Sequence, residues 1–254
     1  DDFELLELEN EPGGNARSGR NEVSAYPWGA HYIPLPSRES RATRLILAEQ
    51  GVLLGDPDAA RPRYEERALC QAPQERLYRN GTWEEGLAPL AGRTRDEIRE
   101  WQRFHDRMRE FRAMRGKDGR RAFAIPLGFS SRDPALLALD RLTLHDWLRG
   151  EGFVSEAVHW LANYACRDDY GCEHREVSAW AGIHYFACRG GAGREDDQDT
   201  VLTWPEGIGF VVRNLVERHG LRATAGAIVH RVEEDRRGVR LLAHLAAEKR
   251  SVEI

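Results

Sequence analysis

The sequence predicts a mixed α/β protein in which a largely helical region interrupts an open-sheet domain, and three observations lead to this prediction. The chain opens with a short apolar run, 3–9, that ends in acidic residues and a Pro-Gly-Gly turn. Its centre, 94–188, has apolar residues at helical spacing, and short apolar runs return from 224 onward. Short runs bounded by turn residues favour strands, whereas recurrence every three or four positions favours helices.

The opening run is predicted to be a buried strand of a parallel sheet, because such strands read as short, continuous apolar runs. Its acidic residue Glu7 would lie at the carboxyl end of the strand, where open α/β sheets bind ligands and dinucleotide folds hold a ribose. Gly13 and Gly14 follow. Neither carries a Cβ, so the backbone there can come close to a bulky sugar or anion.

The next segments are expected to be an extended stretch and a helix. Three prolines and a glycine in 26–36 exclude a helix and favour an extended, aromatic segment. A helix is expected over 37–50, with Gly51 as its C-terminal stop. After it come strands at 67–71 and 75–79, the latter turning through Asn80-Gly81 into a return strand that opens with Thr82 and Trp83.

The longest helix is predicted over 94–114. Thr94 and Glu97 have the spacing of a capping box, and the aromatic stripe that follows is interpreted as core rather than pocket. Shorter helices are expected from Thr143, at 155–165 and at 178–188. The aromatic residues of 178–188 fit either the wall of a hydrophobic pocket or an ordinary helical core, so none of them is assigned a catalytic role.

The remainder of the chain is predicted to return to the first domain. Residues 189–200 are interpreted as a flexible connector, and their glycines lack the strand-before, helix-after context of a phosphate loop. The glycines of 203–209 either let the following helix, 210–220, approach a ligand or simply form a tight turn. Strands are then expected at 224–234, at 239–242 and from Ser251.

Composition excludes several classes of protein. The chain has 254 residues, of which 41% are hydrophobic and 31% charged, and a net charge of −5. This charge gives no nucleic-acid footprint, and no apolar run approaches the roughly 20 residues that span a bilayer. The four cysteines lack C-x-x-C spacing, so we predict no metal site, and we interpret Cys166 and Cys172 as reduced rather than paired.

A family resemblance rests on residues 7–17, which read Glu-Leu-Glu-Asn-Glu-Pro-Gly-Gly-Asn-Ala-Arg. This run resembles the second strand and glycine turn of the FAD-dependent amine oxidase, phytoene desaturase and protoporphyrinogen oxidase superfamily. Gly29-Ala30-His31-Tyr32, 204–209 and Val229 match further segments of that family in order and approximate spacing. In the family a first strand with a G-x-G-x-x-G loop comes before this run, so the chain resembles an internal piece, truncated at both ends.

The resemblance implies a cofactor, FAD, and a role for each matching residue. Glu7 would accept hydrogen bonds from the adenosine ribose, and Gly13 and Gly14 would allow close approach. Asn15 stands where many relatives have arginine, so Arg17 is the alternative phosphate contact. The other implied contacts are Gly29, Ala30, His31 and Tyr32 along the isoalloxazine and Val229 against the adenine.

The domain boundaries follow from the same comparison. Residues 1–36 and 201–254 would form an incomplete, Rossmann-like FAD-binding domain, and residues 37–200 an inserted, largely helical substrate-binding domain carrying the hairpin. The implied activity is an oxidoreductase that transfers a hydride from an amine-like or hydrophobic small molecule to the flavin. Lacking the phosphate loop, the chain alone would bind FAD poorly and be inactive.

Two other interpretations stay open on the sequence. One is a different Rossmann-like enzyme, such as an NAD(P)-dependent reductase or a methyltransferase, which also uses an acid after its second strand. The other is a non-catalytic binding protein derived from a flavoprotein. The sequence favours the cytoplasm without excluding export, and it does not fix the substrate, the electron acceptor, the catalytic residues or the oligomeric state.

Overall fold

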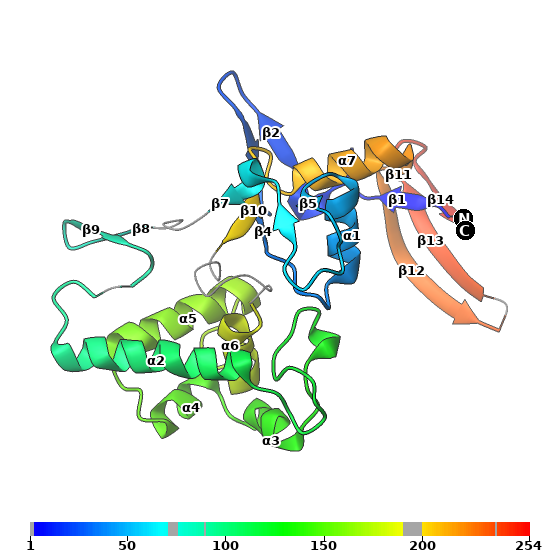
Figure 1. Cartoon of the computed structure of the whole chain (residues 1–254). Helices are drawn as coiled ribbons and strands as arrows, with labels where there is room; N and C mark the ends of the chain where they lie inside the picture. The colour runs from blue at the N-terminus through cyan, green and yellow to red at the C-terminus, as the bar shows by residue number, and fades with distance from the viewer. Residues whose placement is uncertain (1–2, 71–75, 89, 190–199, 237) are drawn as a thin grey trace. The chain divides into compact units, whose positions relative to one another are not determined.

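The computed structural model describes residues 3–70, 76–88, 90–189, 200–236 and 238–254 (Figure 1). The chain divides into two compact units: Asp1–Ile33 with Thr203–Ile254 forms the first, and Pro34–Leu202 forms the second. The chain passes between the units at strands β4 (Tyr32–Pro34) and β10 (Val201–Thr203). No helix in the described part of the chain is long and apolar enough to cross a bilayer.

The first unit begins with a short parallel pair. Strand β1 (Leu5–Glu7) pairs with β11 (Ala223–Ala225), and Glu7 lies opposite Ala225. The parallel strand predicted at the start of the chain is therefore present. All three residues of β1 are only half-buried, however, so the prediction of a fully buried strand is wrong. Among the described residues β1 pairs with β11 alone, so it is less covered than a strand in the middle of a wide sheet.

A second pair follows the glycine turn. The 3₁₀ helix η1 (Gly14–Ala16) leads into β2 (Ser18–Arg20), which pairs antiparallel with β3 (Ala25–Pro27). Asn21 closes the connection by accepting hydrogen bonds from the amides of Val23 and Ser24. The extended segment expected over 26–36 is thus confirmed in its first part.

The rest of the first unit is one helix and an antiparallel meander. Helix α7 (Gly209–His219) ends at Gly220, as the sequence predicts. The strand expected at 224–234 is broken at Gly226, whose φ is 67°. The pairing with β1 therefore ends with β11, and the chain continues into a three-stranded sheet of β12 (Ala227–Asp235), β13 (Gly238–Leu245) and β14 (Arg250–Glu253).

The second unit opens with α1 and short strands. Helix α1 (Arg41–Glu49) begins four residues later than predicted, because Ser37 and Ser40 both donate hydrogen bonds to the carbonyl of Ile125. The strand expected at 67–71 is present only at 69–70, because 67–68 belong to the 3₁₀ helix η2 (Glu66–Ala68), which is capped by the Glu65 carboxylate. The short strands of this region are β5 (Leu53–Leu54), β6 (Arg63–Tyr64), β7 (Leu69–Cys70), β8 (Arg76–Arg79) and β9 (Thr82–Glu85).

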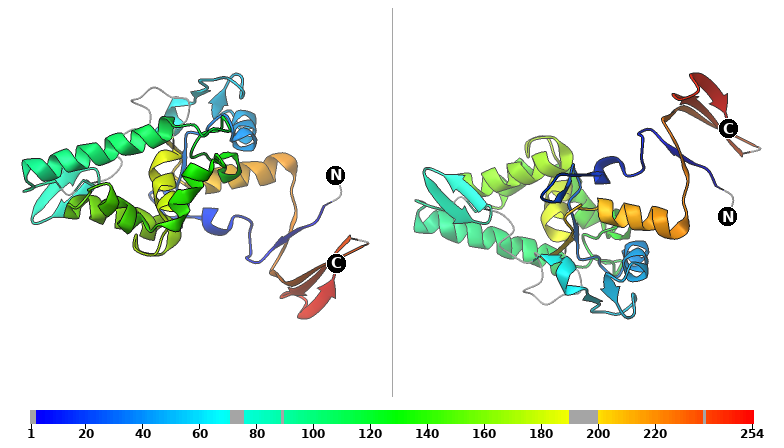
Figure 2. Two further views of the ribbon diagram at one scale, coloured as in Figure 1. Left: turned by 90° about the horizontal axis from the view of Figure 1, so that it is seen from below. Right: turned by 90° about the horizontal axis from the view of Figure 1, so that it is seen from above.

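The hairpin turn at Asn80-Gly81 is confirmed. Both residues have positive φ, 51° and 81°, as a two-residue hairpin turn of this type requires. Figure 2 shows the hairpin beside the starts of α2 (Arg95–Ala113) and α5 (Glu156–Tyr170), and Arg79 Nη2 lies 3.7 Å from a carboxylate oxygen of Glu156.

Helices α2, α4 (Leu144–Gly150), α5 and α6 (Ala179–Ala187) enclose the main core, with the short helix α3 (Pro134–Leu137) beside them. The caps expected at Thr94 and Thr143 are confirmed, and Ser155 and Ser178 cap the other two predicted starts; each of these side chains accepts a hydrogen bond from a first-turn amide. The stripe of α2 is core, as predicted, since Phe104, Met108 and Phe111 are buried. Most of the predicted connector, 190–199, lies outside the described residues.

Candidate functional site

The carboxylate of Glu7 lies at the carboxyl end of β1, next to the parallel strand β11. Its Oε1 accepts a hydrogen bond of 2.8 Å from the amide of Glu9, which fixes the side chain against the following turn. The amide of Gly226 reaches back to the carbonyl of Glu9 over 3.2 Å. The segment after Glu7 is therefore bound to the point where the chain leaves β11 for β12.

The glycine turn has backbone angles that suit glycine. Gly13 and Gly14 have φ of 139° and 51°. The turn is closed by hydrogen bonds from the amide of Ala16 to Gly13 O and from that of Arg17 to Gly14 O, at 2.8 and 3.1 Å. No atom of the described residues lies within 4 Å of the position that a Cβ on Gly14 would take, whereas a Cβ on Gly13 would lie 3.2 Å from Arg17 Cγ. The backbone of the turn is therefore uncovered at Gly14.

Arg17, the predicted phosphate contact, is only partly satisfied. Its Nη1 lies 3.3 Å from the Glu9 carboxylate, whereas its Nε is buried without a hydrogen-bond partner among the described residues. A buried N–H without an acceptor is costly, so an added acceptor there would be stabilising. Arg17 is therefore a predicted site residue whose Nε–H could donate to a ligand.

The second predicted segment, Gly29-Ala30-His31-Tyr32, packs directly on the glycine turn. The amide of Ala30 donates to Asn15 O over 2.7 Å. A Cβ on Gly29 would lie 2.7 Å from that same Asn15 oxygen, so the two backbones touch where only glycine fits. Residues 15 and 29–30, separated in sequence, therefore form one surface.

The third segment, 204–209, contacts Ala30 and His31 of the second segment. The amide of Ile208 donates to Ala30 O over 3.0 Å, and the Thr203 hydroxyl donates to His31 O over 2.7 Å. Gly207 has a φ of 61°, and a Cβ there would lie 2.7 Å from Ala30 O and 2.9 Å from His31 Cα. The structure thus brings together three of the segments that the sequence singled out.

Within the described part of the chain, one ring nitrogen of His31 has a hydrogen-bond partner and the other has none. Its Nδ1 lies 3.1 Å from the carbonyl of Gly29, and since a carbonyl only accepts, Nδ1 carries the proton. The Nε2 of the neutral ring is then an acceptor on an exposed side chain. Trp28, three residues earlier in the chain, is 71% exposed. The imidazole of His31 and this indole are therefore both open to solvent.

Val229 lies on another part of the unit. It belongs to β12, pairs with Ala243 of β13 and is 39% exposed. Its link to the other predicted residues runs through β11, which pairs with β1 at Glu7 and continues through Gly226 into β12. Glu7 and Val229 are therefore joined through the strands, whereas the glycine turn and Gly29–Tyr32 are joined by direct backbone contact.

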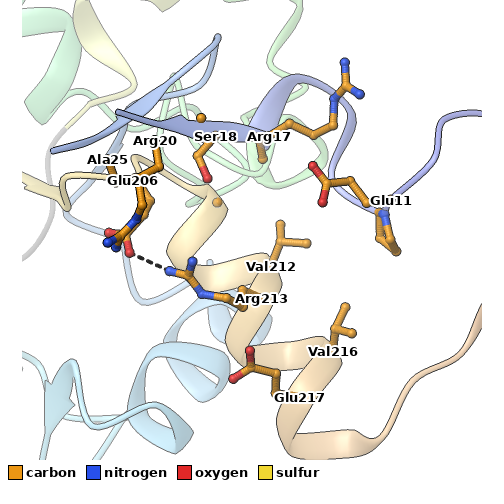
Figure 3. Close-up of a pocket in the computed structure, with 14 residues that line it drawn as sticks. Glu11, Arg17, Ser18, Arg20, Ala25, Glu206, Val212, Arg213, Val216 and Glu217 are labelled. Atoms are coloured by element: carbon orange, nitrogen blue, oxygen red, sulfur yellow. Dashed lines mark hydrogen bonds and ion pairs between the residues drawn. The ribbon is translucent and has the colours of Figure 1, made fainter. Parts of the chain in front are cut away.

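A cavity of about 380 Å³ lies between residues on either side of the glycine turn (Glu11, Pro12, Ala16 and Arg17), strand β2 and helix α7 (Figure 3). Of the predicted site residues, only Arg17 lines it. The sequence did not identify the α7 wall, because those residues read as an ordinary helix face. The charged lining residues are Glu11, Arg17, Arg20, Glu206, Arg213 and Glu217.

The charges that line the cavity are balanced and partly paired. Arg213 Nη2 lies 2.6 Å from Glu206 Oε1, and Figure 3 shows this pair at one end of the cavity. Burial of Glu206 favours its neutral form, but hydrogen bonds from its backbone and from Arg213 outweigh burial, so the pKa of this carboxyl lies below its ordinary value. Three carboxylates and three guanidinium groups suit a polar ligand that carries both signs of charge.

Comparisons with known proteins support the fold. No protein-family model matches the chain, and no curated protein does. Among solved structures it is similar to putrescine oxidase bound to putrescine, with a TM-score of 0.63 and 18% identity over 98% of this chain and 50% of that one. A fatty acid isomerase from P. acnes matches with a TM-score of 0.57 and 16% identity over the same shares. The chain thus spans about half the length of these structures and has the fold of part of an amine oxidase.

Proposed function

We propose that this chain provides part of the FAD site and the substrate-binding region of an FAD-dependent oxidoreductase of the amine oxidase type. The observation that carries the proposal is the carboxylate of Glu7 at the end of a parallel strand, followed by a bare glycine turn. The similarity of the fold to putrescine oxidase supports the same reading.

The residues present fit the adenosine and pyrophosphate parts of FAD. Glu7 uses Oε1 for the Glu9 amide, and no described residue donates to its Oε2, which could accept a ribose hydroxyl. Gly14 faces open space. The buried Nε of Arg17 has no acceptor among the described residues, and a phosphate oxygen is a suitable one.

Each residue would then have a binding role, and FAD, when bound, would supply the acceptor for a hydride. Glu7 would bind the ribose, while Gly13 and Gly14 would let the backbone approach it. Arg17 would bind the phosphate in place of the arginine that many relatives have at the position of Asn15. The exposed surface of Gly29, Ala30, His31 and Tyr32 would flank the isoalloxazine, with Val229 on the adenine side.

The second unit, Pro34–Leu202, would provide the substrate-binding region. Its aromatic helix α6 supports this assignment, since Trp180 lines a cavity of about 260 Å³ together with Leu127, Leu137 and Asp140. The Nε1 of Trp180 is buried without a hydrogen-bond partner among the described residues. An amine-like or hydrophobic substrate with one polar group would suit such a wall.

FAD binding by the protein that contains this chain tests the proposal. Glu7→Gln keeps the shape of the side chain but removes the charge that would accept ribose hydrogen bonds. A hydrogen bond to a charged group contributes about 1.5–3 kcal/mol, so the FAD dissociation constant should rise roughly ten- to a hundredfold. Equilibrium dialysis and flavin fluorescence measure it.

Glu4→Gln is the matched control, because Glu4 is exposed and precedes β1 in the same segment. It should leave FAD affinity unchanged. Equal affinities for wild type and Glu7→Gln would remove Glu7 from the site. A colourless protein that binds a nicotinamide or a methyl donor but not FAD would contradict the flavoprotein assignment itself.

A further inference from the structure

Three histidines of the second unit converge in space although they are far apart in sequence. His145 lies in the first turn of α4, His159 in α5, and His174 in the turn between α5 and α6. One ring nitrogen from each lies within 4.8 Å of those of the other two. Backbone contacts hold this arrangement, since the amide of His145 donates to His174 O over 3.0 Å.

The hydrogen bonds of His159 and His174 determine which ring nitrogens carry protons. His159 Nε2 lies 3.0 Å from the carbonyl of Phe153, so it must donate. His174 Nδ1 lies 2.9 Å from Asn163 Oδ1, which also accepts the His174 amide and is therefore the oxygen of that side chain. It too must donate. The remaining nitrogens, His159 Nδ1 and His174 Nε2, are then both lone-pair acceptors.

These two acceptors face each other at 3.1 Å. Two lone pairs at this distance repel each other unless a proton or a cation lies between them. A metal ion bound between them would satisfy both lone pairs.

His145 also has one ring nitrogen that donates a hydrogen bond and one that keeps its lone pair. Its Nδ1 lies 3.1 Å from Asp146 Oδ1, so this nitrogen donates to a carboxylate and Nε2 keeps its lone pair. A carboxylate behind a histidine fixes the tautomer and raises the basicity of the ligating nitrogen, as it does around bound zinc. The burial also suits entry of an ion: His174 is buried, whereas His145 and His159 are half-exposed.

We propose that His145, His159 and His174 form a binding site for a divalent transition-metal ion, with solvent as the fourth ligand. Tetrahedral zinc has Zn–N distances of about 2.0–2.1 Å, which places ligand nitrogens about 3.3 Å apart. The His159–His174 pair is already near this separation. The ring nitrogens of all three lie within 4.8 Å of one another, so the His145 ring would approach by at most about 1.5 Å, a movement that rotation of a half-exposed ring allows.

The bound ion would join α4, α5 and the turn before α6. The cysteine spacing, which argues against a zinc site, carries no information on this cluster. The three histidines are 14 and 15 residues apart, far from the helical spacing of three or four that marks a ligand pair in sequence. Only the packing of the helices brings them together.

Titration with Co²⁺ and Zn²⁺ tests the site. The protein is first treated with a chelator and then titrated with Co²⁺, whose visible absorption reports tetrahedral nitrogen coordination. We expect saturation at one ion per chain, displacement by Zn²⁺, and a higher unfolding temperature of the second unit with Zn²⁺. Absence of a saturable spectrum at one equivalent in the wild-type protein would overturn the proposal.

His145→Ala removes one ligand at a half-exposed position and should weaken Zn²⁺ binding at least tenfold. His230→Ala, which removes an exposed imidazole from the first unit, is the control and should bind as the wild type does. Loss of affinity in the control, or full affinity in His145→Ala, would place the ion elsewhere. Should His145→Ala fold poorly, the ring ¹⁵N shifts of the wild-type protein decide: Zn²⁺ must move His145 Nε2, His159 Nδ1 and His174 Nε2 together.

Discussion

Gly207→Ala tests the packing on which the candidate site depends. A Cβ at this position would lie 2.7 Å from Ala30 O, 2.7 Å from Pro27 Cβ and 2.9 Å from His31 Cα. Two of these atoms belong to the backbone of the predicted flavin segment and cannot rotate away. Gly207 also has a φ of 61°, which disfavours any residue with a side chain.

The two costs can be separated with a second variant. Gly220 has nearly the same φ, 59°, but none of the atoms that the structure describes lies within 4 Å of its Cβ position. Gly220→Ala should therefore cost only the left-handed backbone, about 1 kcal/mol. Gly207→Ala should add the cost of overpacking, about 2 kcal/mol, to give a total of about 3 kcal/mol.

Urea unfolding followed by pulsed hydrogen exchange and peptide mass spectrometry measures the stability of the first unit separately. The midpoint for Gly207→Ala should fall about 1 M further than that for Gly220→Ala, given a urea dependence of about 1–3 kcal/mol per M. Equal midpoints would refute the close contact between residues 27–31 and Gly207. The packing of segment 204–209 against Gly29-Ala30-His31-Tyr32 would then be lost from the account.

Two further predictions concern titration and reactivity. Removal of the Arg213 guanidinium in Arg213→Met should raise the pKa of Glu206, measured by carboxylate NMR, whereas Arg218→Met on the exposed face of α7 should not. The pKa of Glu206 is lower in the folded state, so ionised Glu206 stabilises the fold at pH values above its ordinary pKa of 4.5, and this stabilisation is lost as the pH falls below that value. An unchanged Glu206 pKa in Arg213→Met would contradict the ion pair. Alkylation at pH 8 should modify the exposed Cys172 well before Cys166, because burial raises the pKa of the Cys166 thiol to about 12, and equal rates would contradict that burial.

The sequence predicted the helices well because their signals are local. Thr94, Thr143, Ser155 and Ser178 each stand three residues before the amide that they cap, so the helix starts can be read without knowledge of the fold. The hairpin at Asn80-Gly81 was predictable for the same reason. A distant partner decides the start of α1, because Ser37 and Ser40 donate hydrogen bonds to the carbonyl of Ile125, and there the predicted boundary was wrong.

The candidate site was predictable only in part. The glycines at 13, 14, 29 and 207 carry a sequence signal, since each occupies a position that a side chain would strain. The backbone hydrogen bonds of Ala30 with Asn15 and Ile208 depend on tertiary packing, so residue spacing could not predict them. The α7 wall of the cavity and the three converging histidines were missed for the same reason.

Photolabelling of the protein that contains this chain, with an FAD analogue that carries an azide on its adenine, tests the central claim most directly. The account predicts that light attaches the label to the β12 peptide containing Val229, and that unlabelled FAD prevents the reaction. A label confined to Pro34–Leu202, or one that excess FAD does not displace, would contradict it.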